Sequence, residues 1–580
     1  MSDTKFALDL TKVPFGRSHS GIMVYEEDNC DGWESKPGLF FVMLTQGGAP
    51  RRQGLVDIDP IVDGQSQPYT YECTPGCLVL ATDCGKVTVV IDTPRTMRIR
   101  GEGVGVRLYT KIPFMTMENA TLLPGDMIDL NLSSINMDGG RFLFKSLKGR
   151  MTLDSFFNVQ LNGPEDAKVE FLPDDDGVFE VAGYLMNPDE WGYIDYESVE
   201  DAAAGAEAEY EAFAKRFPEV SEEWQELKDI ASYSIWLHTQ GPNDREIIPK
   251  VLGDLVYSNA LTAGWAKMFD QPLQAMAVRD AGAAYQLITD AYKHMVNGMP
   301  AVTISTSKLH YQACPPVFGA AVMALMRNGE EPDAETAKQL YDSMSANFDW
   351  WKKSHSFSEN RFSYSHRDEI GLPGVSYSAL EFPLETPDLY TFMILHAAAL
   401  ARLSRIADDG REAEWTDAQE KMTKELMSLW NGEQFECRAA VSGQRYASYS
   451  VLSYLPVILG DLLPAEVTDK LADALGDEEQ FLSSRGFRSE SVRSGIFDPS
   501  VAGRGAVTAW IQMLLFDGLR NARKAETAEK AAERFLAYAR ENGPRDVFDS
   551  EGEQPVRRAG DQVDPLASAA VIYIAGQLGR

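Results

Sequence analysis

The hydrophobic pattern of this chain changes once, near residue 196, and this change constrains the fold more than any other feature. Before it, short segments rich in β-branched and aromatic residues alternate or run apolar, as in Lys86–Ile91 and Gly105–Tyr109. Clusters of Gly, Pro, Asp and Asn separate these segments. Many short strands with turns between them are typical of an antiparallel β-sandwich. We therefore predict an N-terminal β-sandwich over residues 1–195.

After residue 196 the apolar residues repeat with the period of an α-helix. An Ala- and Glu-rich stretch predicts a linker helix within 196–221, and the pattern of residues 222–580 predicts about a dozen further helices. Ser221 and Pro387 stand where helices are expected to begin, and the predicted helices include 258–279, 387–408 and 503–521. This number of helices, without a repeat of constant length, favours six hairpins closed into an (α/α)6 toroid over an α-solenoid. The predicted fold class is multi-domain, β then α.

The charge of the chain limits its partners. There are 54 Lys and Arg against 87 Asp and Glu, which gives a net charge of −33. Such a surface repels the phosphates of nucleic acids and anionic lipids, so we expect neither as a partner. A small, neutral or cationic molecule is a better match.

Other sequence features concern location and metals. No apolar run reaches the roughly 18 residues of a transmembrane helix, and the first residues lack the basic and apolar regions of a signal peptide. The six Cys form no CxxC pair, so we expect free thiols in a reducing compartment and no metal site. The prediction is a cytoplasmic protein without a cofactor; no oligomeric state is predicted.

Four predicted loops combine carboxylates, Arg or aromatic residues next to a helix end. In a toroid the loops at one end form a pocket, so such residues are candidates for a site. Each loop taken alone is more typical of helix caps and surface turns. The loops are Gly264–Asp270, Ser363–Gly371, Gly503–Gly505 and Asp546–Gly552.

Taken in order, these segments resemble the six-hairpin glycosidases of glycoside hydrolase family 63 and the related trehalase and mannosylglycerate-hydrolase-like groups. Val13–Ser20 resembles the opening of their N-terminal sandwich, and Trp265–Asp270 their Trp-x-x-Asp segment. The other similar segments are Gln312–Pro316, Tyr364–Gly371, Pro387–Leu389, Gly503–Ala506 and Asp546–Asp549 with Gly552. The resemblance spans most of the chain and implies a glycosidase on an (α/α)6 barrel.

The chain departs from the family pattern at three positions. The Asp that acts as general acid in the family is replaced by Pro373, which cannot donate a proton. The family's base, a Glu, corresponds to Asp546, whose side chain is one methylene shorter. Gly503 stands where the family has a Trp before the arginine. The fold is therefore expected to be kept while the chemistry is altered or lost.

Glycoside hydrolysis requires a carboxylic acid that protonates the leaving oxygen and a second carboxylate. The resemblance makes Glu369 the first candidate for the acid, because it lies in the matching loop, and Asp368 the second. Asp546 is the candidate base, with Asp549 as the alternative. A solvated loop carboxylate or a turn residue is the competing interpretation for each of them.

Four residues are candidates for substrate binding. Trp265 offers an apolar face for a sugar ring, and Asp270 could accept hydrogen bonds from sugar hydroxyls. Arg504, between two glycines, could hold hydroxyls or a carboxylate, and His366 lies in the matched loop. The competing interpretations are a core Trp, a helix cap, a salt bridge and a structural His.

The prediction is a glycoside hydrolase that cleaves a short glycoside or glycan fragment with inversion. Two alternatives remain open. The missing acid favours a sugar-binding protein that has lost catalysis. A non-hydrolytic epimerase or isomerase on the same barrel would use a His pair or a Lys to abstract a proton.

Overall fold

The computed structural model describes most of the chain. The described residues are 6–20, 22–27, 38–43, 56–111, 119–131, 141–155, 157–158, 163–164, 166–186, 196–240, 255–256, 266–304, 309–552 and 563–578.

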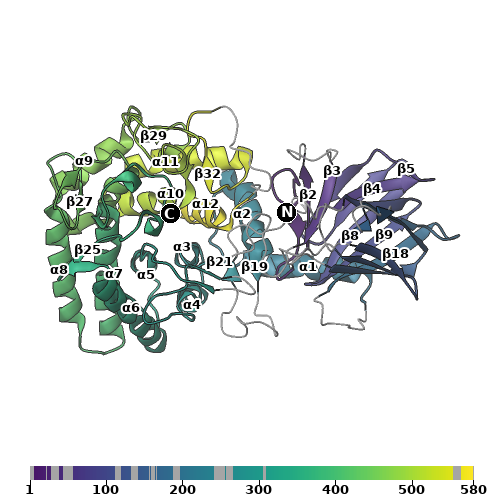
Figure 1. Ribbon diagram of the computed structural model, residues 1–580, viewed down its shortest axis with the longest axis horizontal. Helices are drawn as coiled ribbons and strands as arrows, with labels where there is room; N and C mark the ends of the chain where they lie inside the picture. The colour runs from purple at the N-terminus through teal and green to yellow at the C-terminus, as the bar shows by residue number, and fades with distance from the viewer. Residues whose placement is uncertain are drawn as a thin grey trace.

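Two antiparallel eight-stranded sheets make up the N-terminal region (Figure 1). The first follows the order β1 (Phe15–Gly16), β2 (Ile22–Glu27), β3 (Gly38–Met43), β4 (Val56–Val62), β10 (Gly105–Lys111), β17 (Asp166–Leu172) and β14 (Arg150–Asp154), with β5 (Gln65–Ser66) beside β4. The second follows the order β11 (Asn119–Leu123), β12 (Met127–Asn131), β13 (Arg141–Lys148), β18 (Val178–Met186), β9 (Thr96–Glu102), β8 (Gly85–Thr93), β7 (Leu78–Thr82) and β6 (Thr70–Cys73).

Alternating side chains join these two sheets in one core. In β17, the side chains of Ala167, Val169 and Phe171 are buried while their neighbours are half-buried, which is the period-two pattern of a strand with one covered face. They belong to the same apolar core as Ile99 and Phe179 of the second sheet. The predicted antiparallel, sheet-rich N-terminal region is therefore confirmed.

A helix connects the sheets to the helical region. α1 (Val199–Ala214) begins after Ser198, whose side chain accepts a hydrogen bond from the Asp201 amide, as an N-cap does. It packs against β8 and against α2 (Gln225–His238). Glu209 of α1 also pairs with Arg17 at 2.9 Å. The domain boundaries 1–195, 196–221 and 222–580 stay a prediction.

Helices dominate the rest of the chain. They are α2, α3 (Asp270–Ala275), α4 (Ala281–Ala291), α5 (Phe318–Arg327), α6 (Ala334–Ser354), α7 (Pro387–Ile406), α8 (Glu412–Met427), the 3₁₀ helix η6 (Leu455–Leu462), α9 (Ala465–Gly476), α10 (Ala509–Asn521), α11 (Ala525–Asn542) and α12 (Pro565–Leu578). The described strands of this region are pairs or triplets of residues, such as β31 (Val507–Thr508) and β32 (Val547–Phe548). None of the described helices is both long and apolar enough to span a membrane.

The helices pack in a closed ring. α12 contacts α3, α3 contacts α5, α5 contacts α7, α7 contacts η6, η6 contacts α10, and α10 contacts α12 again. The remaining helices pack on members of this ring: α2 on α12, α4 on α3, α6 and α8 on α7, α9 on η6, and α11 on α10. Figure 1 shows this region beside the sheets. Inner and outer helices therefore alternate along the chain.

Two predicted helices are shorter in the structure. The helix expected over 258–279 is helical only in α3, because β21 (Ala266–Lys267) pairs with β22 (Thr303–Ile304) before it; residues 257–265 lie outside the described residues. The helix expected from residue 503 starts at Ala509, because β31 pairs with β32 first. Local pairing thus replaces helix at Ala266–Lys267 and at Val507–Thr508.

Candidate active site

Three aspartates, of which Asp270 and Asp564 are buried and Asp546 is half-buried, form a cluster with one lysine at the ends of three segments. Asp270 begins α3, and Lys267 lies in β21 three residues before it. Asp546 directly precedes β32, and Asp564 directly precedes α12. Each carboxylate interacts electrostatically with Lys267. The folded chain therefore brings Asp270 together with Asp546, although they lie far apart in the sequence.

Burial determines the charge state of Asp270. Its side chain is only 2% exposed. Burial raises the pKa of Asp270 to about 6; the ammonium of Lys267 lowers this pKa and the charge of Asp546 raises it. In turn, the charge of Asp270 raises the pKa of Lys267. Asp270 consequently changes its protonation state close to neutral pH.

The negative charge of Asp546 makes ionisation of Asp564 less favourable. Burial raises the pKa of Asp546, against the opposing effect of Lys267. Burial, followed by the charge of Asp546, raises the pKa of Asp564. The amides of Leu566 and Ala567 donate to Asp564 Oδ1 at 2.8 and 2.9 Å, and these bonds favour its ionised form. Asp564 is thereby fixed at the start of α12.

Polar atoms without partners belong to this cluster. Among the described residues, Asp270 Oδ2 and Asp546 Oδ1 are buried and have no hydrogen-bond partner. The same holds for both amide atoms of Gln274, which follows Asp270 by one helical turn on the same face of α3. Buried polar atoms are normally hydrogen-bonded, so a polar ligand bound beside these atoms would supply the hydrogen bonds that they lack.

The predicted acid Glu369 is tied to its own loop. Its Oε2 accepts a hydrogen bond from the Ser365 amide at 2.6 Å, and its Oε1 lies 3.3 Å from His355 Nε2. His366 and Asp368 are exposed; His366 Nδ1 accepts a hydrogen bond from the Asp368 amide at 3.3 Å. Both carboxylate oxygens of Glu369 are therefore engaged in the described structure.

The loop that follows Glu369 runs between Phe269, the neighbour of Asp270, and Arg504. A Cβ atom on Gly371 would lie 3.3 Å from the ring of Phe269, and the Gly374 carbonyl accepts a hydrogen bond from Arg504 Nε at 3.3 Å. Gly503 packs against the same loop. The loop therefore contacts both the residue before Asp270 and the segment of Arg504.

A further buried carboxylate, Glu490, lies against this loop. Its Oε2 accepts a hydrogen bond from Ser376 Oγ at 3.1 Å. Burial raises the pKa of Glu490 to about 7, while hydrogen bonds from Ser494 and Ser376 and the charge of Arg504 lower it. Sequence reasoning missed this residue, because only the fold shows that a Glu between serines is buried. Lys267 and Asp564 were missed for the same reason.

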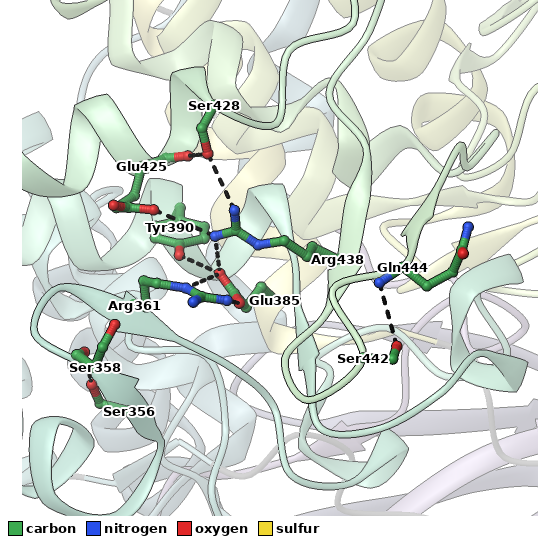
Figure 2. Close-up of polar contacts among 10 residues, drawn as sticks. All are labelled: Ser356, Ser358, Arg361, Glu385, Tyr390, Glu425, Ser428, Arg438, Ser442 and Gln444. Carbon is green, nitrogen blue, oxygen red and sulfur yellow. Dashed lines mark hydrogen bonds and ion pairs between the residues drawn. The ribbon is translucent and has the colours of Figure 1, made fainter.

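A separate network fixes the start of α7 (Figure 2). Glu385 accepts hydrogen bonds from Arg361, from Arg438 at 2.5 Å and from Tyr390 at 2.7 Å. Burial alone would raise the pKa of Glu385, but the bonds from Arg438, Arg361 and Tyr390 lower it. Glu385 is therefore a paired, structural carboxylate.

The predicted site residues fall into three groups. Asp270 and Asp546 share the cluster around Lys267. Arg504 is exposed and lies at the loop that follows Glu369. Trp265 lies outside the described residues. Asp549, the alternative base, accepts hydrogen bonds from the amides of the turn that follows it, which is the role of a turn residue.

Comparison with known proteins adds a family to this geometry. Residues 374–560 match a family model described as the mannosylglycerate hydrolase MGH1-like glycoside hydrolase domain. Among solved structures, the family 63 mannosylglycerate hydrolase from Thermus thermophilus in complex with glucose matches with a TM-score of 0.51 and 14% identity, over 60% of this chain and 99% of that chain. Its complex with Tris and D-glycerate matches with a TM-score of 0.50 and 15% identity over the same shares. No curated protein matches the chain.

The family match includes the loop of Arg504 and Asp546, two of the segments on which the resemblance was based. The solved structures show that about 60% of the chain shares their fold. At the level of the family, these findings support glycoside hydrolysis as the activity. The resemblance of this chain to the mannosylglycerate-hydrolase-like glycosidases of family 63 is therefore confirmed.

Proposed function

We propose that this protein is a glycoside hydrolase that cleaves a short glycoside with inversion, on an (α/α)6 toroid. One observation carries the proposal: Asp270 and Asp546, two carboxylates that each have a buried oxygen without a partner among the described residues, meet around Lys267. Such carboxylate oxygens are suited to accept hydrogen bonds from sugar hydroxyls or from a water molecule.

The closed ring of helices supports the toroid. Inner and outer helices alternate along the chain, so successive inner helices run in the same direction and begin at the same end of the ring. Asp270 begins one inner helix, α3. Asp388 lies in the first turn of another, α7, and Asp564 precedes a third, α12. Residues at these three helix starts therefore share one end of the barrel.

Asp546 is the proposed base. In an inverting reaction the base removes a proton from the water that attacks the anomeric carbon, while an acid protonates the leaving oxygen. The water attacks one face of the sugar and the leaving oxygen departs from the opposite face, so the base and the acid must lie on opposite sides of the sugar. Asp546 precedes α12, and α12 lies opposite α7 in the ring of six. A proton donor is therefore expected on the loop that leads to α7.

Asp270 and Gln274 are proposed to bind the sugar. They follow one another on the same face of α3, and their polar atoms without described partners are suited to hydroxyl recognition. Trp265 and Arg504 remain proposed binding residues from the resemblance, and so does His366. Glu369 remains a candidate for the acid; to donate a proton it must release the Ser365 amide or His355. A cytoplasmic location stays a prediction.

The test is hydrolysis of a panel of disaccharides, aryl glycosides and mannosylglycerate, read as released sugar, with the anomer assigned by NMR. Wild-type protein should release the inverted anomer. Asp546→Asn should reduce the rate by about 10²–10⁴-fold, as expected for loss of an essential base. The control is Asp417→Asn on the outer helix α8, which should keep the full rate.

A sugar-binding protein without catalysis is the second candidate. The observation that favours it is Pro373 at the position of the family's acid. If no glycoside is cleaved while calorimetry shows that a sugar binds, and Asp270→Asn abolishes that binding, the sugar-binding function replaces the hydrolase.

A further inference from the structure

Glu490 is a buried acid that the proposed mechanism has not used. It lies on the connection between α9 and α10, where its backbone pairs with Ser450. The residue has no exposed surface. Its Oε1 has no hydrogen-bond partner among the described residues, and its Oε2 is 3.1 Å from Ser376 Oγ. Ser376 and Ser494 are the two hydroxyl groups that interact with this acid, and protonated Glu490 can donate to Ser376 Oγ and so pass a proton through that hydroxyl.

Ser376 connects this acid to the loop where a proton donor is needed. It lies three residues after Pro373, on the loop that leads to α7, and it is half-buried while Glu490 is fully buried. Its Oγ is also 2.9 Å from Ser448 Oγ. The Ser376 hydroxyl is therefore the more accessible end of a hydrogen-bonded pair whose inner end is Glu490.

The loop that contains Pro373 is contacted by residues from a neighbouring segment. Arg504 Nε donates to the carbonyl of Gly374, and Gly503 packs on Pro373 without a side chain between them. Glu490 interacts electrostatically with Arg504. The carboxyl group of Glu490 therefore contacts this loop at Ser376, three residues after Pro373, which itself has no carboxyl group.

We propose that Glu490 is the proton source of the glycosidase reaction and that the Ser376 hydroxyl passes this proton to the leaving oxygen. The proposal rests on the proposed function and deepens it. In this proposal Glu490 does not contact the substrate itself; it supplies its proton to Ser376, and Ser376 contacts the substrate.

The proton balance involves two transfers on the side of the leaving oxygen and one on the side of the attacking water. As the bond between the anomeric carbon and the leaving oxygen breaks, Ser376 Oγ gives its proton to that oxygen and receives the proton of Glu490. Water forms the new bond to the anomeric carbon and loses a proton to Asp546. The cycle ends with Glu490 ionised and Asp546 protonated, and exchange with solvent restores both.

Burial suits Glu490 to this role. An acid of this kind must hold its proton near neutral pH, which an apolar, water-excluding environment favours. The interacting groups identified around Glu490 are Ser376, Ser494 and the Arg504 guanidinium, and all three lower its pKa from the value that burial alone would give. The result is a pKa of about 7, close to the working range of a general acid.

The test compares two leaving groups. Glycosyl fluorides need little or no protonation of the departing fluoride, whereas disaccharides require protonation of the leaving oxygen. The probes are the α- and β-fluorides of glucose, mannose and galactose, together with disaccharides of the same sugars. On a disaccharide, Glu490→Gln and Ser376→Ala should each lose about 10²–10⁴-fold in kcat. On the matching fluoride, both variants should react at close to the wild-type rate.

Further variants separate proton supply from folding. Ser376→Thr keeps a hydroxyl and should restore the disaccharide rate. Glu381→Gln, an exposed carboxylate before the same helix, should react like wild type with both substrates. Thermal unfolding identifies a variant that has lost its fold, which would lose both activities. For wild type, the decline of kcat/KM above neutral pH should be present with the disaccharide and absent with the fluoride.

Several outcomes would overturn the proposal. If Glu490→Gln cleaves disaccharides at the wild-type rate, Glu490 supplies no proton, although the hydrolase function stands. If Glu369→Gln rather than Glu490→Gln loses only the disaccharide activity, Glu369 is the acid. If a folded Glu490→Gln loses fluoride and disaccharide hydrolysis equally, its role is structural. If wild type cleaves no substrate of the panel, the proposed function fails and the proton source with it.

Discussion

Gly503 lies directly against Pro373: a Cβ atom on Gly503 would overlap the Pro373 carbonyl oxygen. These are two of the three positions at which the sequence is expected to depart from the family pattern. The departures are therefore in contact, and a large side chain at 503 is incompatible with the present path of the loop.

The first prediction follows from this contact. Gly503→Ala should destabilise the protein by about 1–3 kcal/mol, the usual cost of overpacking, because the added methyl group meets backbone atoms that cannot rotate away. It should also lower kcat/KM by displacing the loop. Urea unfolding measures the first effect. Gly205→Ala is the control, since a Cβ atom there meets nothing within 4 Å in α1; it should be neutral or slightly stabilising. If Gly503→Ala and Gly205→Ala changed the stability equally, the loop at Pro373 would have moved to accommodate the added methyl group.

The second prediction concerns Asp270 and pH. Its pKa in the folded protein is about 6, above the ordinary value of 3.8. The folded state therefore favours the protonated form, and this contribution to stability is lost as pH rises through 6. Between pH 5 and pH 7 wild type should lose about 1 kcal/mol of unfolding free energy relative to Asp270→Asn. Urea unfolding at both pH values measures this difference. Asp368→Asn, at an exposed position, should show the same pH dependence as wild type. A constant difference between Asp270→Asn and wild type would contradict the raised pKa.

The fold was predictable where periodicity alone determines it. The helix expected over 387–408 is present as Pro387–Ile406, and the strand expected over 169–172 is present within the longer strand Asp166–Leu172. The site was predictable only in part. Asp270 and Asp546 stand in recognisable segments. Glu490 accepts a hydrogen bond from a serine 114 residues away, and no local pattern encodes such a contact.

The third prediction concerns the network of Glu385. Its side chain is 1% exposed, and two arginines neutralise it. Glu385→Gln should lower the free energy of unfolding by about 3 kcal/mol at neutral pH, because it leaves Arg361 and Arg438 without their shared carboxylate. Thermal and urea unfolding measure the loss. The matched control is Glu381→Gln, four residues earlier and exposed, which should change stability by less than about 0.5 kcal/mol. Similar losses in both variants would show that the network contributes little.

The last prediction concerns Lys267 and the proposed base. Asp546 must be ionised to accept a proton from water, and burial raises its pKa while Lys267 lowers it. Activity should therefore fall on the acid side at a higher pH than for an ordinary carboxylate. Lys267→Met removes the attraction that keeps Asp546 ionised, so the acid limb of kcat/KM should move up by about one pH unit. The measurement is the pH profile with a glycosyl fluoride, for which proton donation to the leaving group is not needed. Lys293→Met is the control, since its partner is Asp290 and not Asp546, and its profile should match wild type. An acid limb that stays in place or moves down in Lys267→Met would show that Asp546 is not the group that titrates, and the assignment of the base would have to be abandoned.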